Sequence, residues 1–103
     1  MILTKKKLIR LTGKSLAKLN KDIHERDGYT CIIPGCGRHV ALEEKFHHEP
    51  CGNGNKEDRI EKGLLLCYKV HHKHRHDGPG SAIIQQLCEE YLRRIYPEVW
   101  QGE

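Results

Sequence analysis

The sequence predicts a small α+β domain held together by a bound metal, and three observations favour this fold class. The chain has 103 residues, of which 37% are hydrophobic and 6% aromatic, so it can bury only a thin core. Its five cysteines and eight histidines offer metal ligands that would compensate for this. Short extended segments also alternate with amphipathic helical ones. We expect a basic arm over residues 1–14 and a single domain over 15–103.

Two amphipathic helices are predicted at either end of this domain. Residues 16–26 place apolar side chains on one helical face, with Ser15 as the N-cap and Gly28 as the stop. A last helix over about 81–96 starts at a capping serine and ends before Pro97. Its core stripe is expected to contain Ile84, Leu87, Cys88, Tyr91, Leu92 and Ile95.

The middle of the chain is expected to hold two short strands. Residues 40–49 alternate as an extended strand that ends in paired histidines, which would point to opposite faces. A polar, exposed loop over 51–62 follows, and 64–66 form the second strand. The histidine-dense stretch 67–76 is predicted to be a helix. Residues 2–11 read either as a short strand or as a loose arm.

Two ligand pairs on separate turns predict a structural zinc. Pro34-Gly35 forces a tight turn that brings Cys31 and Cys36 together, and Cys67 with either His71 or His74 supplies the second pair. The competing interpretation is buried free thiols, but it does not explain why a core-poor domain keeps both turns. Cys51 and Cys88 are left out of the site, the latter because it lies on the apolar stripe of the last helix.

The remaining histidines predict a second metal site with open coordination positions. His72 and His76 are four residues apart on one helical face, and His47 on the strand would complete three ligands for a divalent ion. An incomplete shell of this kind suits a catalytic metal. His48 would be free to act as a general base. Surface histidines with no joint role are the competing interpretation.

Positive charge is concentrated near the N-terminus. The first 21 residues contain no acid, and their basic side chains include Lys5, Lys6, Lys7 and Arg10. Such an arm suits a phosphate backbone, although it would equally serve as a solvated tail. The longest apolar run, 64–66, is too short to cross a bilayer, so we expect a cytoplasmic protein whose thiols stay reduced.

Three segments together resemble the HNH nuclease family, whose fold is the ββα-metal core, also called the His-Me finger. They are Arg26-Asp27-Gly28-Tyr29-Thr30-Cys31, Phe46-His47-His48-Glu49-Pro50, and Leu64-Leu65-Leu66-Cys67 before a histidine-bearing helix. The resemblance covers about half of the chain and is strongest to short phage or mobile-element members. It implies a core over 26–77 with a structural zinc knuckle and flanking helices, in the cytoplasm of a bacterium or a phage-infected host.

The resemblance also implies an activity, the hydrolysis of phosphodiester bonds in DNA. By position, His48 would activate water, while His47, His72 and His76 would hold Mg²⁺, Mn²⁺ or a similar divalent ion. Lys73 and Arg75 would lie near the DNA backbone, because the helix of such nucleases enters the minor groove. A non-catalytic, zinc-stapled nucleic-acid-binding module is the alternative, and it would share the DNA binding but not the cutting.

Two departures from the family pattern bear on these roles. The second zinc pair usually has a cysteine three residues after the first, where this chain has Val70. If His71 takes that place with one extra residue, the spacing of His72 and His76 is kept; otherwise Arg75 falls at a metal-ligand position. The family's middle asparagine is also missing just before the second strand, and its replacement would be Asn53 or Asn55 in the preceding loop, or a backbone carbonyl.

So short a chain has little surface for reading bases, and one site per chain would nick DNA unless two copies meet and cut both strands. We therefore expect low sequence selectivity unless a homodimer or a larger protein partner supplies it. No membrane partner is expected.

Overall fold

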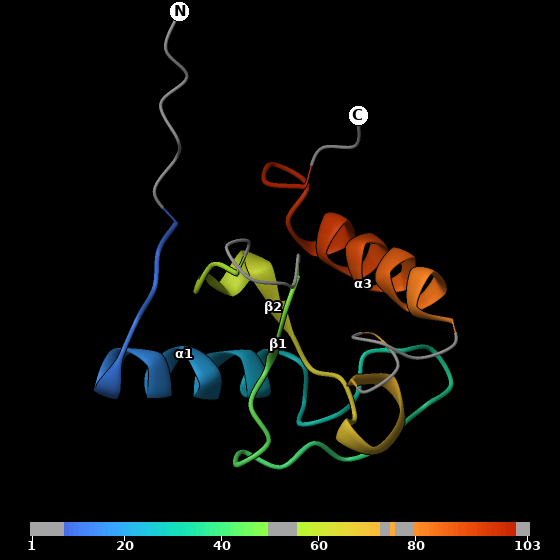
Figure 1. The fold of residues 1–103 in the computed structure, drawn as a ribbon, viewed down its shortest axis with the longest axis horizontal. Coiled ribbons are helices and arrows are strands. Elements are labelled where there is room, and N and C mark those ends of the chain that lie inside the picture. Colours follow the sequence, from blue (N-terminus) through green and yellow to red (C-terminus); the bar gives the residue numbers. More distant parts are fainter. Residues whose placement is uncertain (1–7, 50–55, 73–74, 76–79, 101–103) are drawn as a thin grey trace, which may run out of the picture.

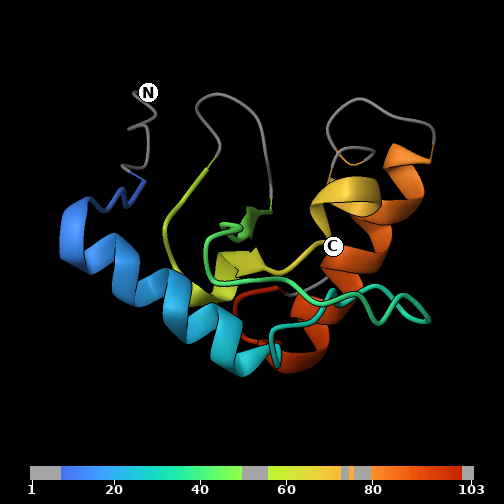
Figure 2. The ribbon, with the colours of Figure 1, turned by 90° about the horizontal axis from the view of Figure 1, so that it is seen from below.

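The computed structural model describes residues 8–49, 56–72, 75 and 80–100, and shows a small α+β fold. A two-stranded antiparallel sheet lies between a first helix, α1 (Gly13–Arg26), and a last helix, α3 (Ser81–Ile95), as both Figure 1 and Figure 2 show. A 3-10 turn, η1 (Ile60–Lys62), precedes the second strand, and a π-helical turn, η2 (Tyr68–His72), follows it. Within the described residues, no helix combines the length and the apolar character needed to cross a bilayer.

Helix α1 ends where the sequence predicts but starts three residues early. Its N-cap is Thr12 in an extended conformation, and Ser15, predicted as the cap, lies inside the first turn. The buried face holds Leu19, Ile23 and His24. His24 is fully buried, and its two ring nitrogens face backbone carbonyls of α1 and of the 41–44 segment at 2.7–3.0 Å. These contacts attach the segment before β1 to the helix.

The end of α1 is tied to the sheet by a charged pair. Arg26 donates to the backbone carbonyls of Ile60 and Gly63, at 2.7 Å each, and binds the neighbouring carboxylate of Asp27. Asp27 in turn accepts from the backbone N–H of Leu65 and from the hydroxyl of Tyr91 on α3. One buried ion pair therefore holds α1, the strand β2 and α3 together, which explains why residues 26–27 matter to the fold.

The two strands are shorter than predicted. β1 is His47–His48 and β2 is Gly63–Leu64, paired with His47 opposite Leu64 and His48 opposite Gly63. Gly63 is needed at this point, because a Cβ there would stand 2.7 Å from side-chain atoms of both Ile23 and Phe46. Residues 40–46 do not form a strand, and several of their backbone groups bond to side chains of α1 instead: the carbonyl of Ala41 to His24, and the carbonyl of Leu42 and the N–H of Phe46 to Asn20.

The core is thin, as the composition predicts, and fills the space between α1, the sheet and α3. Cys88 is fully buried on α3, which confirms its prediction as a core residue. The prediction that Ile95 belongs to the same buried stripe is wrong, since Ile95 is 37% exposed. Ser81 does not cap α3: Gly80 is the N-cap, and the Ser81 hydroxyl donates to the carbonyl of Arg75 at 2.7 Å. The buried apolar side chains are Leu19, Ile23, Cys31, Ile33, Val40, Phe46, Leu64, Leu65, Leu66, Cys67, Ile84, Cys88 and Leu92.

The prediction of an exposed loop over 51–62 is wrong for its second half. Residues 50–55 lie outside the described residues, so nothing tests the roles of Cys51, Asn53 and Asn55. Glu57 and Asp58, however, are 7% and 3% exposed. They are buried because the segment 8–11 lies along them and forms hydrogen bonds to both carboxylates and to the backbone N–H of Asp58.

Candidate metal centre and histidine site

A closed loop presents the first two thiols of the candidate metal centre. Thr30 and His39 form an isolated antiparallel bridge, and the N–H of Cys31 donates to the carbonyl of Arg38 at 2.9 Å. Between these ends the chain reverses at Pro34-Gly35, with Gly35 at a φ of +82°, which a glycine adopts without strain. The loop therefore brings Cys31 and Cys36 to one side, as the turn residues predict.

The second half of the centre is delivered by β2 and the π-helical turn η2. Ile32 donates to the carbonyl of Leu65 at 3.0 Å, so the loop is bonded directly to the chain that leads to Cys67. The next turn, η2, has the wider π geometry, which accommodates one residue more than an α-helical turn. This agrees with the alignment in which His71, four residues after Cys67, replaces the cysteine that usually stands three residues after the first.

The four predicted ligands come together. Atoms of Cys31, Cys36, Cys67 and His71 that could bind a metal all lie within 4.8 Å of one another. Cys36 and Cys67 have their sulfurs 3.8 Å apart, and Nδ1 of His71 is 3.4 Å and 3.2 Å from the sulfurs of Cys31 and Cys67. Zinc bonds of about 2.3 Å to sulfur and about 2.0 Å to nitrogen would place tetrahedral ligands roughly 3.8 Å and 3.5 Å apart. The donor set and its spacing therefore fit a structural zinc.

The thiols of the centre differ in acidity. Burial raises the pKa of Cys31 to about 12. Burial also opposes ionisation of Cys36, but hydrogen bonds from the Arg38 backbone and from the neighbouring thiols bring its pKa below the usual value. A metal that binds here must displace protons, since the thiolate is the ligand.

The second predicted site is only partly within the described residues. The side chain of His72 and the whole of His74 and His76 lie outside them, as do Lys5, Lys6, Lys7 and Lys73. The predicted convergence of His47, His72 and His76 on one ion therefore stays a prediction. Among the described residues, no further group of three or more His, Cys, Asp or Glu side chains comes together as the Cys3His group does.

His48 is paired with a carboxylate. Its Nε2 donates to Oδ1 of Asp58 at 2.7 Å, which leaves Nδ1 as the ring nitrogen that can accept a proton. Asp58 also accepts from the N–H of Leu11 and from the guanidinium of Arg10, at 2.7 Å and 3.2 Å. Burial opposes its ionisation, yet these three donors hold its pKa below the usual range. Arg10, predicted to meet a phosphate backbone, thus bonds to Asp58, although its side chain is 57% exposed.

The pKa of His48 lies below the usual value for a histidine. Burial is the main cause, and the positive charges of Arg10 and Lys56 act in the same direction, while Asp58 opposes them. The imidazole is therefore neutral at pH 7, which is the form that can take a proton from water.

His47 belongs to a different cluster, on the opposite face of β1, as the strand alternation predicts. Its Nε2 donates to Glu49 at 3.0 Å, and the guanidinium of Arg75 binds both carboxylate oxygens of Glu49 at 3.1 Å and 2.8 Å. Burial opposes ionisation of Glu49, but these donors lower its pKa. The prediction that Arg75 lies near a DNA backbone does not agree with this position, since its side chain is 10% exposed and bonded to a buried carboxylate.

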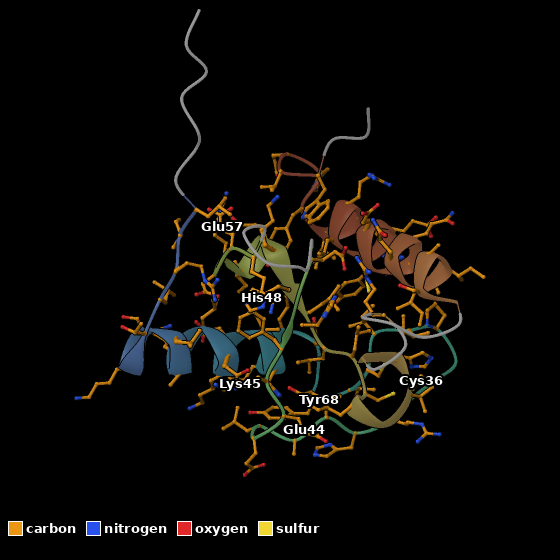
Figure 3. The ribbon with its side chains drawn as sticks, viewed as in Figure 1. Cys36, Glu44, Lys45, His48, Glu57 and Tyr68 are labelled. Atoms are coloured by element: carbon orange, nitrogen blue, oxygen red, sulfur yellow. The ribbon has the colours of Figure 1, made fainter. Side chains whose placement is uncertain are left out.

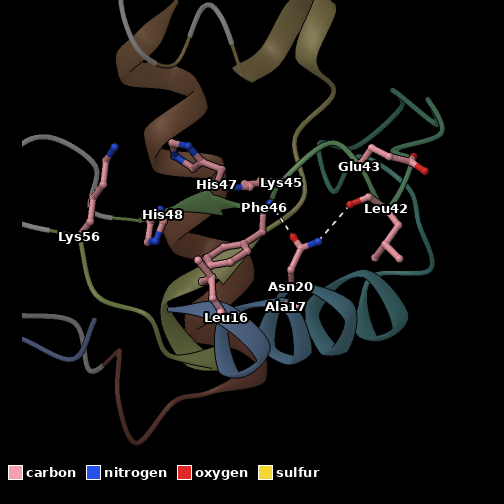
Figure 4. A pocket seen from close by; sticks show the side chains of 11 residues that line it. Leu16, Ala17, Asn20, Leu42, Glu43, Lys45, Phe46, His47, His48 and Lys56 are labelled. Atoms are coloured by element: carbon pink, nitrogen blue, oxygen red, sulfur yellow. Dashed lines mark hydrogen bonds between the residues drawn. The ribbon is translucent and has the colours of Figure 1, made fainter. Parts of the chain in front are cut away.

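A pocket opens beside His48, between α1 and the segment that enters β1 (Figure 4). It has a volume of about 440 Å³. Leu16, Ala17, Leu42 and Phe46 give it an apolar wall, and Lys56 lies at the same end as His48. In Figure 3, Cys36 lies by η2 while His48 lies on β1, so the pocket and the Cys3His group are separate places in the fold.

Sequence reasoning missed Asp58 and Glu49, the two carboxylates that bond to the paired histidines. Glu49 had a usable signal, because it stands two residues after His47 and so on the same face of an extended chain. Asp58 had none, since it stands ten positions after His48 in the sequence and its place depends on the segment 8–11.

Comparisons of this chain with models of protein families, with curated proteins and with solved structures found no match. The structure establishes a small α+β domain with a Cys3His group that could bind a metal. That this chain is an HNH nuclease remains a prediction from the sequence.

Proposed function

We propose that this protein is a metal-dependent endonuclease that hydrolyses phosphodiester bonds in DNA, with His48 as the general base. The single observation that carries the proposal is the pair of His48 and Asp58 beside a pocket with Lys56 at its rim. A buried carboxylate bonded to one imidazole nitrogen selects the tautomer whose other nitrogen accepts a proton. A protein that only binds nucleic acid has no need of such a pair.

The reaction would use His48 and Asp58 in distinct roles. Nδ1 of His48 takes a proton from water, and the oxygen of that water attacks phosphorus while the bond to the 3′ oxygen breaks. The departing oxygen takes up a proton, and the imidazolium returns its own to solvent. Asp58 is a positioning residue: it orients the ring and stabilises the imidazolium without touching the substrate. It would do the work that the family's missing asparagine does.

A divalent ion would be held by His47, His72 and His76 and would stabilise charge on the phosphate and the leaving oxygen. Of these three side chains, only that of His47 lies within the described residues, and it is 1% exposed and bonded to Glu49. The structural zinc is proposed for the Cys3His group, where the donor set fits.

The alternative is a zinc-stapled module that binds nucleic acid without cutting it. The Cys3His group favours this function equally, because it stabilises the fold without taking part in catalysis. The basic N-terminal segment would serve both functions.

Plasmid cleavage separates the two functions. The wild type should cut supercoiled plasmid in Mg²⁺, Mn²⁺, Ni²⁺ or Zn²⁺ and stop when EDTA is added. His48→Ala should lower the rate by roughly 10²–10⁴-fold, the usual contribution of a general base, and Asp58→Asn by about 10–100-fold. His39→Ala is the matched control, because His39 is an exposed histidine of the cysteine loop and should cut normally.

Undiminished cutting by His48→Ala would remove His48 from the proposed role. Salt-dependent DNA binding by a wild type that cuts in none of these metals would favour the binding module instead.

A further inference from the structure

The pocket beside His48 has two chemically different parts. One wall is apolar and is formed by Leu16 and Ala17 of α1 together with Leu42 and Phe46. Leu42 is 41% exposed, so part of a large hydrophobic side chain faces solvent at the rim. An exposed apolar surface next to polar groups is typical of a ligand site.

The other part of the pocket is cationic. Lys45 and Lys56 line it and supply the positive charge, Glu43 is the one acidic side chain among its lining residues, and His47 and His48 line it as well. The amide of Asn20 also lines the pocket, but it is occupied by the carbonyl of Leu42 and the N–H of Phe46. The two lysines are thus suited to an anion, and the apolar wall is suited to a flat ring.

We propose that this pocket binds one nucleotide of a nucleic-acid strand with its base unpaired, the base on the apolar wall and the phosphate toward Lys56 and His48. The inference deepens the proposed nuclease function and rests on it for the role of His48, since it names single-stranded or locally opened DNA as the substrate class.

The size and the position of the pocket support this occupant. Its volume of about 440 Å³ falls within the roughly 300–1,000 Å³ typical of small-ligand sites, which is room for a single nucleotide and not for a stacked duplex. A base inside a duplex has both faces covered by its neighbours, so only an unpaired or extruded base can lie on this wall. A phosphate beside that base would then stand next to the proposed general base.

Filling the pocket tests the inference without disturbing the core. Ala17 lines the pocket and is exposed on α1, so Ala17→Leu adds bulk there while keeping a strong helix former. Ala82→Leu is the matched control, because Ala82 is also an exposed alanine of a helix, α3, and is absent from the pocket lining. Equal melting temperatures of the two variants would show that both fold.

The measurement is fluorescence anisotropy with two labelled strands of the same length, oligo-dT and a deoxyribose-phosphate strand without bases. No divalent metal is added, so nothing is cut. The wild type should bind oligo-dT more tightly than the abasic strand, since stacking of a base on an aromatic side chain such as Phe46 typically changes affinity by roughly 5–150-fold. Ala17→Leu should lose this preference, and Ala82→Leu should keep it. Lys56→Gln should weaken the binding of both strands alike.

Equal affinity of the wild type for the two strands, or the same preference in Ala17→Leu and Ala82→Leu, would overturn the inference. The result is separable from the nuclease proposal. Plasmid cutting with no base preference would leave the nuclease standing and remove the pocket. A base preference that Ala17→Leu abolishes, in a protein that cuts nothing, would keep the nucleotide site and remove the nuclease.

Discussion

Comparing Cys36→Ala with Cys88→Ala decides whether the Cys3His group holds a metal, because packing and metal binding predict opposite orders of stability. Cys88 is fully buried, whereas Cys36 is only half-buried. If the thiols merely fill space, Cys88→Ala must destabilise the protein more. If Cys36 is a zinc ligand, Cys36→Ala must destabilise it more.

The size of each effect follows from the structure. Deleting the Cys88 sulfur removes about one buried methylene-sized group and leaves a small cavity, which costs roughly 1–2 kcal/mol. A structural zinc contributes about 10–16 kcal/mol to folding in small peptides, so losing one of four ligands costs roughly 2.5–4 kcal/mol. A domain of 103 residues has a total stability of about 5–15 kcal/mol, and Cys36→Ala should therefore lose a large share of it while Cys88→Ala loses less.

The assay combines thermal unfolding, followed by circular dichroism, with the zinc content of the dialysed proteins by mass spectrometry. We expect one zinc in the wild type and in Cys88→Ala, a reduced content in Cys36→Ala, and a lower melting temperature for Cys36→Ala than for Cys88→Ala. Removal of zinc by a strong chelator should unfold the wild type. A Cys36→Ala protein that melts above Cys88→Ala and matches the wild type in zinc content would refute the metal centre.

Two further predictions concern the fold around the paired histidines. Gly63→Ala should lower the free energy of unfolding by about 1–3 kcal/mol in a urea titration, because the added methyl group would overlap buried Ile23 and Phe46. Adding Phe46→Leu should restore part of this loss. An unchanged urea midpoint in Gly63→Ala would contradict the close approach of Gly63 to these two side chains. Arg75→Met should cost about 3–5 kcal/mol by leaving the carboxylate of Glu49 buried without its cation. The double variant with Glu49→Gln should lose less, and equal losses would show that the pair is not coupled.

Much of the candidate metal centre could be predicted from local sequence. The turn at Pro34-Gly35 and the position of Cys67 after an apolar run are local features, and they correctly group three cysteines. Sequence alone left His71 and His74 as alternatives, since both follow Cys67 within one or two helical turns. In the structure, the π-helical turn η2 places Nδ1 of His71 3.4 Å and 3.2 Å from the sulfurs of Cys31 and Cys67.

The histidine site shows where such reasoning stops. The alternation of His47 and His48 along the strand was predictable, because successive residues of any extended chain point to opposite faces. The burial of Asp58 and of Arg75 could not be predicted from the sequence, because each depends on a bonding partner far away in the chain.

The sequence by itself therefore determined the α+β class, the end of the first helix, the tight turn between two thiols and the opposite directions of the paired histidines, all of which follow from interactions between near neighbours. Only the tertiary structure decided which carboxylates bond to those histidines, how short the strands are and where a pocket opens. The physical reason is that a buried charge is stable only when it is paired, and its partner can lie far away in the sequence. For Asp58 the partner His48 is ten positions away, and for Glu49 the partner Arg75 is twenty-six positions away.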